Sequence, residues 1–342
     1  MPRRRNSPGG PAAFAAYTSG PSAPPPPPPS KAKAAAAYAA KLVRSPDNWW
    51  LLLLLASATL YAQLLDAALA PKALEGFAVT ATHPAFHRDV VARQATARVL
   101  VDGLAPLSSP VWRAHDDAND LLFVEAAARR VWRHEDGTGL VRVGASVFLD
   151  KAGSLACVGT ADADALVLCG DQHAATVADD GSRTPLWAGA ATAVSAGGAY
   201  FGGDRNGTWV VEARNGTRVA ALAAAPRALA FAPDAKTLYA QTAAALYALT
   251  CDGACGAPRT FHEHGGAGLA VDGAGRVYAT TPRAVVVLAL GGALLGALEI
   301  EDPTGLALAT DGHLYVTTAG GRLLRVAVRR GVRPAAVVTT GG

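Results

Sequence analysis

A short phrase that returns about every forty residues constrains this chain more than any other feature of its sequence. Each copy has apolar residues at alternate positions, a polar turn with Asp or Gly, and a second short apolar run. The clearest copies cover residues 227–241, 267–281 and 304–318, and weaker copies cover 109–125, 145–159 and 191–203. Aligned near the end of the second run, successive copies lie 33 to 44 residues apart, at Phe123, Ala156, Tyr200, Tyr239, Tyr278 and Tyr315.

The alternation has a period of two, so each copy predicts a β-hairpin and not an amphipathic helix. Repeats of this length are typical of a β-propeller, in which four-stranded sheets, called blades, stack around a central axis. One blade cannot bury both of its faces, so its neighbours must cover them. Six copies predict an all-β, six-bladed β-propeller over residues 97–342. Residues 75–100 or the stretch Ala335–Thr339 could supply the strand that closes the ring.

The chain before the repeats divides into three stretches of different composition. Residues 1–46 lack apolar periodicity and contain a run of six prolines, so we expect a disordered, Pro/Ala-rich tail. Residues 49–65 carry no charge and begin with two tryptophans, and their length is near the minimum that crosses a bilayer. We therefore expect a transmembrane signal anchor over residues 47–70, followed by a linker over 71–96.

The charges that flank the apolar stretch predict a location. Residues 1–48 contain seven Lys or Arg and one Asp. The positive-inside rule then predicts a single-pass membrane protein with a cytoplasmic N-terminus and a propeller in the secretory lumen or outside the cell. Cleavage as a signal peptide and import into a plastid or mitochondrion are the alternatives. The rest of the chain has 24 basic and 26 acidic groups, which argues against a nucleic-acid partner.

Cysteines and glycosylation sequons also favour the secretory pathway. All four cysteines follow the apolar stretch, as expected where disulfides persist, and the sequence leaves their pairing open. A zinc site of four thiolates is not expected, because the first two and last two cysteines lie about 80 residues apart with unlike spacings. Asn206 and Asn215 each begin an Asn-Gly-Thr sequon, although Asn-Gly is also a preferred hairpin turn. The predicted disulfide cysteines are Cys157, Cys169, Cys251 and Cys255.

Four segments of the repeats have sequences similar to those of a known protein family. They are ARVLVDGLAPLSSPVW (97–112), PRALAFAPDAKTLY (226–239), GAGLAVDGAGRVY (266–278) and PTGLALATDGHLYVTTAGGRLLRV (303–326). In order and content they resemble the gluconolactonase/regucalcin-like (SMP-30/gluconolactonase, SGL) family of six-bladed propellers, over about residues 97–328. Membrane-anchored strictosidine-synthase-like propellers share the layout of tail, anchor and six blades, and are close rivals.

The resemblance implies a metal site. Family members of the lactonase type hold one divalent cation, such as Ca²⁺, at the mouth of the central channel through oxygen ligands, and the ion promotes lactone hydrolysis. Carried over to this sequence, the ligand positions fall on Ser108, Gly189, Arg227 and Ala267. None of these has a carboxylate, and the guanidinium of Arg227 would repel a cation. We therefore predict no metal ligand in this chain, and the cation stays an implication of the resemblance alone.

Other residues could replace the lost chemistry. His262, Glu263 and His264 lie just before Ala267, on a loop that should approach the channel mouth. The best catalytic candidates are Arg227, which could stabilise an oxyanion, and His264 with Glu263, which could act as a general base. The alternative interpretation of this loop is a solvated polar turn.

Two functions remain open from the sequence. The first is a hydrolase of the lactonase type that acts on a small lactone or ester. The second is a non-catalytic propeller that binds a small molecule at its mouth, or a protein partner. The substituted ligand positions favour the second function, and the resemblance favours the first.

Overall fold

The computed structural model describes residues 53–54, 56–61, 63, 72–114, 119–135, 145–150, 152, 155–160, 165–171, 173–178, 182–195, 200–252 and 254–335. The chain divides into two compact units, Met1–Leu65 and Asp66–Gly342, and each is described by itself. The predicted tail, residues 1–46, lies outside the described residues, as do residues 336–339 of the C-terminal stretch.

The predicted membrane anchor is wrong. Residues 53–54, 56–61 and 63 are helical, with Leu53, Leu60 and Tyr61 exposed. Within the part of the chain that the structure describes, no helix is long and apolar enough to cross a membrane. The prediction of a single-pass membrane protein is therefore wrong. The cytoplasmic N-terminus and the lumenal propeller were derived from that prediction and lose their basis with it.

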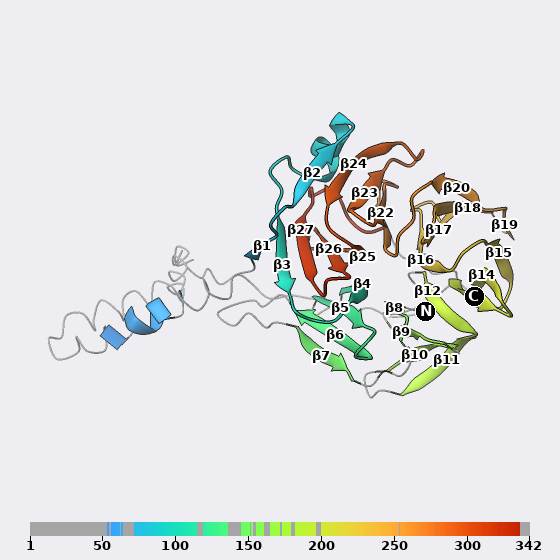
Figure 1. Cartoon of the computed structure of the whole chain (residues 1–342), viewed down its shortest axis with the longest axis horizontal. Helices are drawn as coiled ribbons and strands as arrows, with labels where there is room; N and C mark the ends of the chain where they lie inside the picture. Colours follow the sequence, from blue (N-terminus) through green and yellow to red (C-terminus); the bar gives the residue numbers. More distant parts are fainter. Residues whose placement is uncertain are drawn as a thin grey trace, which may run out of the picture. The chain divides into compact units, whose positions relative to one another are not determined.

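The second unit is an all-β propeller of six antiparallel sheets arranged around a central channel (Figure 1). Blade 1 contains β4 (Leu107–Ala114), β5 (Asn119–Glu125), β6 (Arg130–Glu135) and β7 (Ser146–Leu149). Blade 2 contains β8 (Cys157–Thr160), β9 (Leu166–Cys169), β10 (His173–Val177) and β11 (Arg183–Ala188). Blade 3 contains β12 (Ala190–Val194), β13 (Tyr200–Arg205), β14 (Thr208–Ala213) and β15 (Arg218–Leu222).

The last three blades carry additional strands. Blade 4 contains β16 (Pro226–Phe231), β17 (Thr237–Thr242), β18 (Leu246–Asp252), β19 (Ala254–Cys255) and β20 (Arg259–His262). Blade 5 contains β21 (Leu269–Val271), β22 (Val277–Thr281), β23 (Ala284–Leu288), β24 (Leu294–Glu299) and β2 (Ala78–Ala81). Blade 6 contains β25 (Pro303–Leu308), β26 (His313–Thr318), β27 (Leu323–Ala327), β3 (Ala97–Val101) and β1 (Lys72–Ala73).

The innermost strands form a closed ring. Each contacts the next, in the order β4, β8, β12, β16, β21 and β25, and β25 returns to β4. Side chains join neighbouring blades as well: Thr304 Oγ1 donates a hydrogen bond to the Leu107 carbonyl, and Gln241 Nε2 donates one to the Thr280 carbonyl at 2.7 Å. The six-bladed ring predicted from the repeat is confirmed.

An N-terminal strand closes the ring. In blade 6, β3 pairs with β27, so that Val101 lies opposite Leu323 and Ala97 opposite Val326 (Figure 1). Strand β2 adds an outer strand to blade 5 in the same way. Between them, the short π-helix η2 (Phe86–Val90) buries both of its end residues in the core that blades 5 and 6 share. Of the two candidates for the closing strand, the structure selects the N-terminal one.

Five of the six repeat copies coincide with the inner hairpin of a blade, but the copy at 145–159 does not. It begins in β7, the outer strand of blade 1, and ends in β8, the inner strand of blade 2. The inner hairpin of blade 2 is instead β8–β9, in which Cys157 lies opposite Cys169. The repeat therefore predicts that blade 2 exists, but it places the inner hairpin of that blade one strand too early.

All four cysteines form disulfides, as predicted. Cys157 and Cys169 link β8 to β9, with their Cα atoms 4.9 Å apart. Cys251 and Cys255 link β18 to β19, with their Cα atoms 3.9 Å apart. Each bond joins residues that are paired across a ladder, so the disulfides reinforce hairpins within single blades.

The two Asn-Gly-Thr sequons lie in exposed turns at opposite ends of β14. Asn206 has a positive φ of 55° and precedes Gly207, as in a tight hairpin turn. Asn215 accepts a hydrogen bond from the Thr217 backbone N–H at 3.0 Å. Both asparagines therefore have a structural role as turn residues, and their glycosylation stays a prediction.

Candidate functional site

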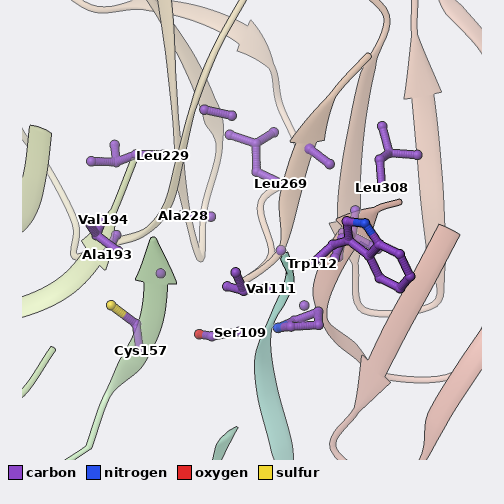
Figure 2. Close-up of a pocket in the computed structure, with 18 of the residues that line it drawn as sticks. Ser109, Val111, Trp112, Cys157, Ala193, Val194, Ala228, Leu229, Leu269 and Leu308 are labelled. Atoms are coloured by element: carbon purple, nitrogen blue, oxygen red, sulfur yellow. The ribbon is translucent and has the colours of Figure 1, made fainter. Parts of the chain in front are cut away.

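The candidate site is a cavity of about 360 Å³ in the central channel, to which all six innermost strands contribute (Figure 2). Ser109 and Val111 come from β4, Cys157 from β8 and Leu229 from β16. The cavity lies where every blade presents its inner edge, so its shape depends on how closely the inner strands approach one another.

Glycines set that approach at the amino-terminal ends of the inner strands. A Cβ atom on Gly268, just before β21, would lie 2.6 Å from the Cα of Gly305 in β25. A Cβ on Gly305 would overlap Pro110 of β4. Real Cβ atoms do not approach other heavy atoms this closely, so blades 5, 6 and 1 meet backbone to backbone at this point.

Most of the side chains that line the cavity are apolar. Its hydroxyl groups belong to Ser109, Thr160 and Thr310, and Thr310 accepts a hydrogen bond from Trp112 Nε1 at 3.2 Å. Trp112 in turn stacks on the ring of Tyr315, with the two centroids 5.5 Å apart. Arg227 is the one charged residue among the described residues that line the cavity. The site therefore combines an apolar body with a single cation.

Arg227 and Ser109 both lie near the amino-terminal ends of their strands. Arg227 is the second residue of β16 and is exposed, and its side chain has no hydrogen bond or ion pair with any described residue. Ser109 has a φ of 47°, which residues other than glycine seldom adopt. We call this end of the channel the mouth.

The positions carried over from the family do not form a metal site. Arg227 and Ala267 line the cavity, and Ser108 lies beside the lining residue Ser109. Gly189, before β12, packs against the Trp187 ring instead. No carboxylate or imidazole is among the described lining residues, and no group of three or more His, Cys, Asp or Glu within the described ranges could hold a metal ion. The donor set does not fit a divalent cation.

The structure does not bring the other catalytic candidates to Arg227. Glu263 and His264 are exposed on the loop from β20 to β21, and neither lines the cavity. The His264 ring makes an edge contact with His262, with centroids 5.4 Å apart. Burial lowers the pKa of His262, the nearby His264 lowers it further, and Glu263 opposes the change. The loop matches the alternative interpretation, a polar turn on the surface.

The C-terminal segment, residues 333–335, forms part of the cavity at the end opposite the mouth. The Arg333 carbonyl accepts a hydrogen bond from the Gly273 N–H at 2.8 Å, and the Ala335 N–H donates one to the Val271 carbonyl at 3.0 Å. Pro334 and Ala335 line the cavity. Sequence reasoning missed this role because the segment is held by its backbone, and no residue type signals such a contact.

A buried carboxylate fixes the turn that carries this segment. Asp272 is fully buried, and its Oδ2 accepts hydrogen bonds from Arg276 Nε at 2.6 Å and from the Tyr278 hydroxyl at 3.1 Å. Its Oδ1 accepts bonds from the backbone N–H groups of Ala274 and Arg276. Burial raises the pKa of Tyr278 well above its usual value, and the Asp272 charge raises it further. We call Asp272, Arg276 and Tyr278 the aspartate knot.

Comparisons with known proteins support the fold. No family model matches the sequence, and no curated protein sequence matches it. A gluconolactonase from Xanthomonas campestris has a similar structure, with a TM-score of 0.64 and 21% identity, covering 75% of this chain and 98% of that one. A calcium-binding regucalcin from Agrobacterium tumefaciens has a TM-score of 0.53 and 14% identity, covering 70% and 97%.

A third solved structure has a different described role. An auxiliary nutrient binding protein from Bacteroides ovatus has a TM-score of 0.52 and 12% identity, covering 70% of this chain and 77% of that one. At these identities the likeness concerns the fold. The chain is thus a six-bladed propeller whose structural neighbours include the gluconolactonase and regucalcin propellers, as the resemblance in the sequence predicted.

Proposed function

We propose that the central cavity binds a small organic molecule without a resident metal ion. The observation that carries this proposal is the lining itself, in which Arg227 is the one charged side chain among the described residues. Concave, largely apolar sites with a few polar groups are the usual form of small-molecule sites, and about 360 Å³ lies within their usual range of sizes.

The chemistry of the mouth argues against the family's cation. Ca²⁺ takes six to eight oxygen ligands, mostly from carboxylates, carbonyls and water. The described side chains at the mouth offer the Ser109 hydroxyl, whereas the positively charged Arg227 guanidinium repels a cation. The same guanidinium is suited to an anionic or strongly polar group on an organic ligand.

A neutral apolar dye tests the proposal. We expect N-phenylnaphthylamine to bind the full chain with one equivalent, to gain fluorescence, and to do so equally after treatment with EDTA. Ala267→Trp, at the mouth, should block binding, because the indole fills the entrance. Ala244→Trp is the matched control, because Ala244 is exposed in the β17–β18 turn and does not line the cavity.

Thermal melting of both variants shows whether they fold. Binding that survives in Ala267→Trp, or that disappears with EDTA and returns with stoichiometric Ca²⁺, contradicts the proposal.

Hydrolysis of a small lactone or ester is the second candidate. It is supported by the likeness to two propellers described as a gluconolactonase and a putative gluconolactonase, which the alignments cover over 98% and 99% of their lengths. In this chain it requires Arg227 to stabilise an oxyanion, while the candidate base His264 lies outside the cavity wall. Turnover of lactones or aryl esters that is lost in both Arg227→Met and His264→Ala would favour this candidate over simple binding.

A further inference from the structure

We propose that the cavity selects amphipathic monocarboxylates, with the carboxylate at Arg227 and the apolar body directed along the channel toward residues 333–335. This inference rests on the proposed function and names the ligand class of that same site. It follows from three features of the lining: the single cation, its position at one end, and the segment at the other end.

The charge balance favours a monoanion. The Arg227 side chain has no partner among the described residues, so its guanidinium is free to donate two hydrogen bonds to a carboxylate in the bidentate geometry that this side chain favours. The described lining holds no second cation. A dicarboxylate or a phosphate dianion would bring an uncompensated negative charge against apolar walls, which is costly. One guanidinium therefore matches one carboxylate.

The Ser109 hydroxyl belongs to the blade on the opposite side of the ring from Arg227. Arg227 belongs to blade 4 and Ser109 to blade 1, and these blades are three places apart in a ring of six, so they lie opposite each other. The Ser109 hydroxyl makes no hydrogen bond with the described residues, and Figure 2 shows it at the cavity wall. It can donate to a carboxylate oxygen at the mouth. The guanidinium and the Ser109 hydroxyl thus both belong to the mouth, whereas the Thr160 and Thr310 hydroxyls lie toward the opposite end.

The walls below the mouth suit an apolar body of limited length. From Arg227 to Phe231, β16 advances about 13 Å at the usual rise of a strand. Along this path the cavity is lined by Ala228, Leu229 and Ala230. Pro334 and Ala335 line the far end, and two backbone hydrogen bonds hold the segment in place. A chain longer than this distance would meet that segment.

The experiment measures displacement of N-phenylnaphthylamine from the full chain by octanoate, octanol and the dicarboxylate suberate. We expect octanoate to compete at least about tenfold more strongly than octanol or suberate, because only octanoate pairs one charge with Arg227 and buries an apolar body. Arg227→Met should remove the advantage over octanol, and Arg227→Lys should retain part of it. Arg259→Met is the matched control: Arg259 is exposed on β20 of the same blade, outside the cavity.

A second arm tests the far end. Ala335→Trp should weaken competition by decanoate about tenfold while leaving hexanoate unchanged, because the indole shortens the channel from the end opposite Arg227. A thermal melt checks that this variant folds. An equal loss for both acids, or no loss for either, overturns the assigned orientation.

The outcomes separate this inference from the proposed function. Equal competition by octanol and octanoate, or an Arg227→Met variant that keeps the preference for octanoate, overturns the monocarboxylate assignment and leaves a small-molecule cavity. Failure of the neutral dye to bind the unmodified chain overturns both proposals. A preference for octanoate that depends on Arg227 and not on Arg259 supports the inference.

Discussion

Blades 2 and 5 secure their inner hairpins in different ways. In blade 5 the aspartate knot holds the turn between β21 and β22 through the buried Asp272 carboxylate. In blade 2 a disulfide between Cys157 and Cys169 joins β8 to β9 at the opposite end of the hairpin, beside the channel mouth. One hairpin depends on a network of charges and hydrogen bonds, and the other on a covalent bond.

The same blade geometry can therefore be stabilised through the folded state or through the unfolded state. Hydrogen bonds to a buried carboxylate stabilise the folded hairpin directly. A disulfide acts mainly by restricting the unfolded chain. The two blades should therefore respond to different perturbations, and four predictions test this.

Asp272→Ala should give the largest effect. It removes the acceptor of four hydrogen bonds and leaves the Arg276 guanidinium, only 13% exposed, without its anion. We expect a loss of about 4 kcal/mol in the free energy of unfolding, measured by urea denaturation. Asp234→Ala in the corresponding turn of blade 4 is the control. Asp234 is exposed and bonds only backbone N–H groups, so its loss should cost about 1 kcal/mol. Equal losses would contradict the assigned role of the knot.

Replacing Cys157 and Cys169 together with alanine should give the next largest effect. The bond closes a loop of 12 residues, for which chain entropy predicts about 3 kcal/mol. The same change at Cys251 and Cys255, with a separation of 4, should cost about 2 kcal/mol. Urea denaturation of both double variants, with and without a reductant, measures the difference. If the Cys251/Cys255 variant loses more free energy of unfolding than the Cys157/Cys169 variant, loop length does not determine how much these disulfides stabilise the protein.

Tyr278→Phe should have a smaller effect. The change removes the hydroxyl bond to Asp272 and keeps the buried ring, so we expect a loss of about 1 kcal/mol in the free energy of unfolding. Tyr239→Phe is the matched control, because Tyr239 occupies the same repeat position in blade 4 and its hydroxyl has no partner among the described residues. If the free energy of unfolding falls equally in the two variants, the hydrogen bond from the Tyr278 hydroxyl to Asp272 does not contribute to stability.

Alkaline pH should weaken blade 5 by a modest amount. Burial and the Asp272 charge raise the pKa of Tyr278, so the folded state keeps its proton after the unfolded state has lost it. This contribution is complete below the unfolded pKa of about 10 and is lost as the pH rises above it. The free energy of unfolding, compared at pH 9 and above pH 10, should fall less in Tyr278→Phe than in the unmodified chain. An identical fall in the free energy of unfolding of the two proteins would contradict the raised pKa of Tyr278.

The two blades also differ in how well their sequences predict them. Blade 5 contains an Asp-Gly turn before a Tyr, and burial alternates along β21, so the repeat phrase is complete. In β9 all four residues, LVLC, are buried, which leaves no alternation to detect. The repeat therefore predicted the number of blades, but it placed the hairpin of blade 2 one strand too early.

The candidate site was predictable only in part. The resemblance placed Ser108, Gly189, Arg227 and Ala267 at the channel mouth; Arg227 and Ala267 are among the residues that line the cavity, and Ser108 and Gly189 are not. It did not predict the C-terminal segment, because residues 333–335 are held by backbone hydrogen bonds that any sequence could make. The membrane anchor was predicted from hydropathy alone, and no helix in the described part of the chain is long and apolar enough to cross a membrane.

Closure of the ring by β3 has a consequence for synthesis of the chain. Strand β3 is made before any of the inner strands, yet its partner β27 is completed only when Leu323 and the residues after it have left the ribosome. Until then, the blades already made form an open arc with unpaired strand edges at both ends, which are sites for aggregation. Nascent chains that stop before β27 should therefore depend on chaperones for their solubility, whereas chains that include it can close on themselves.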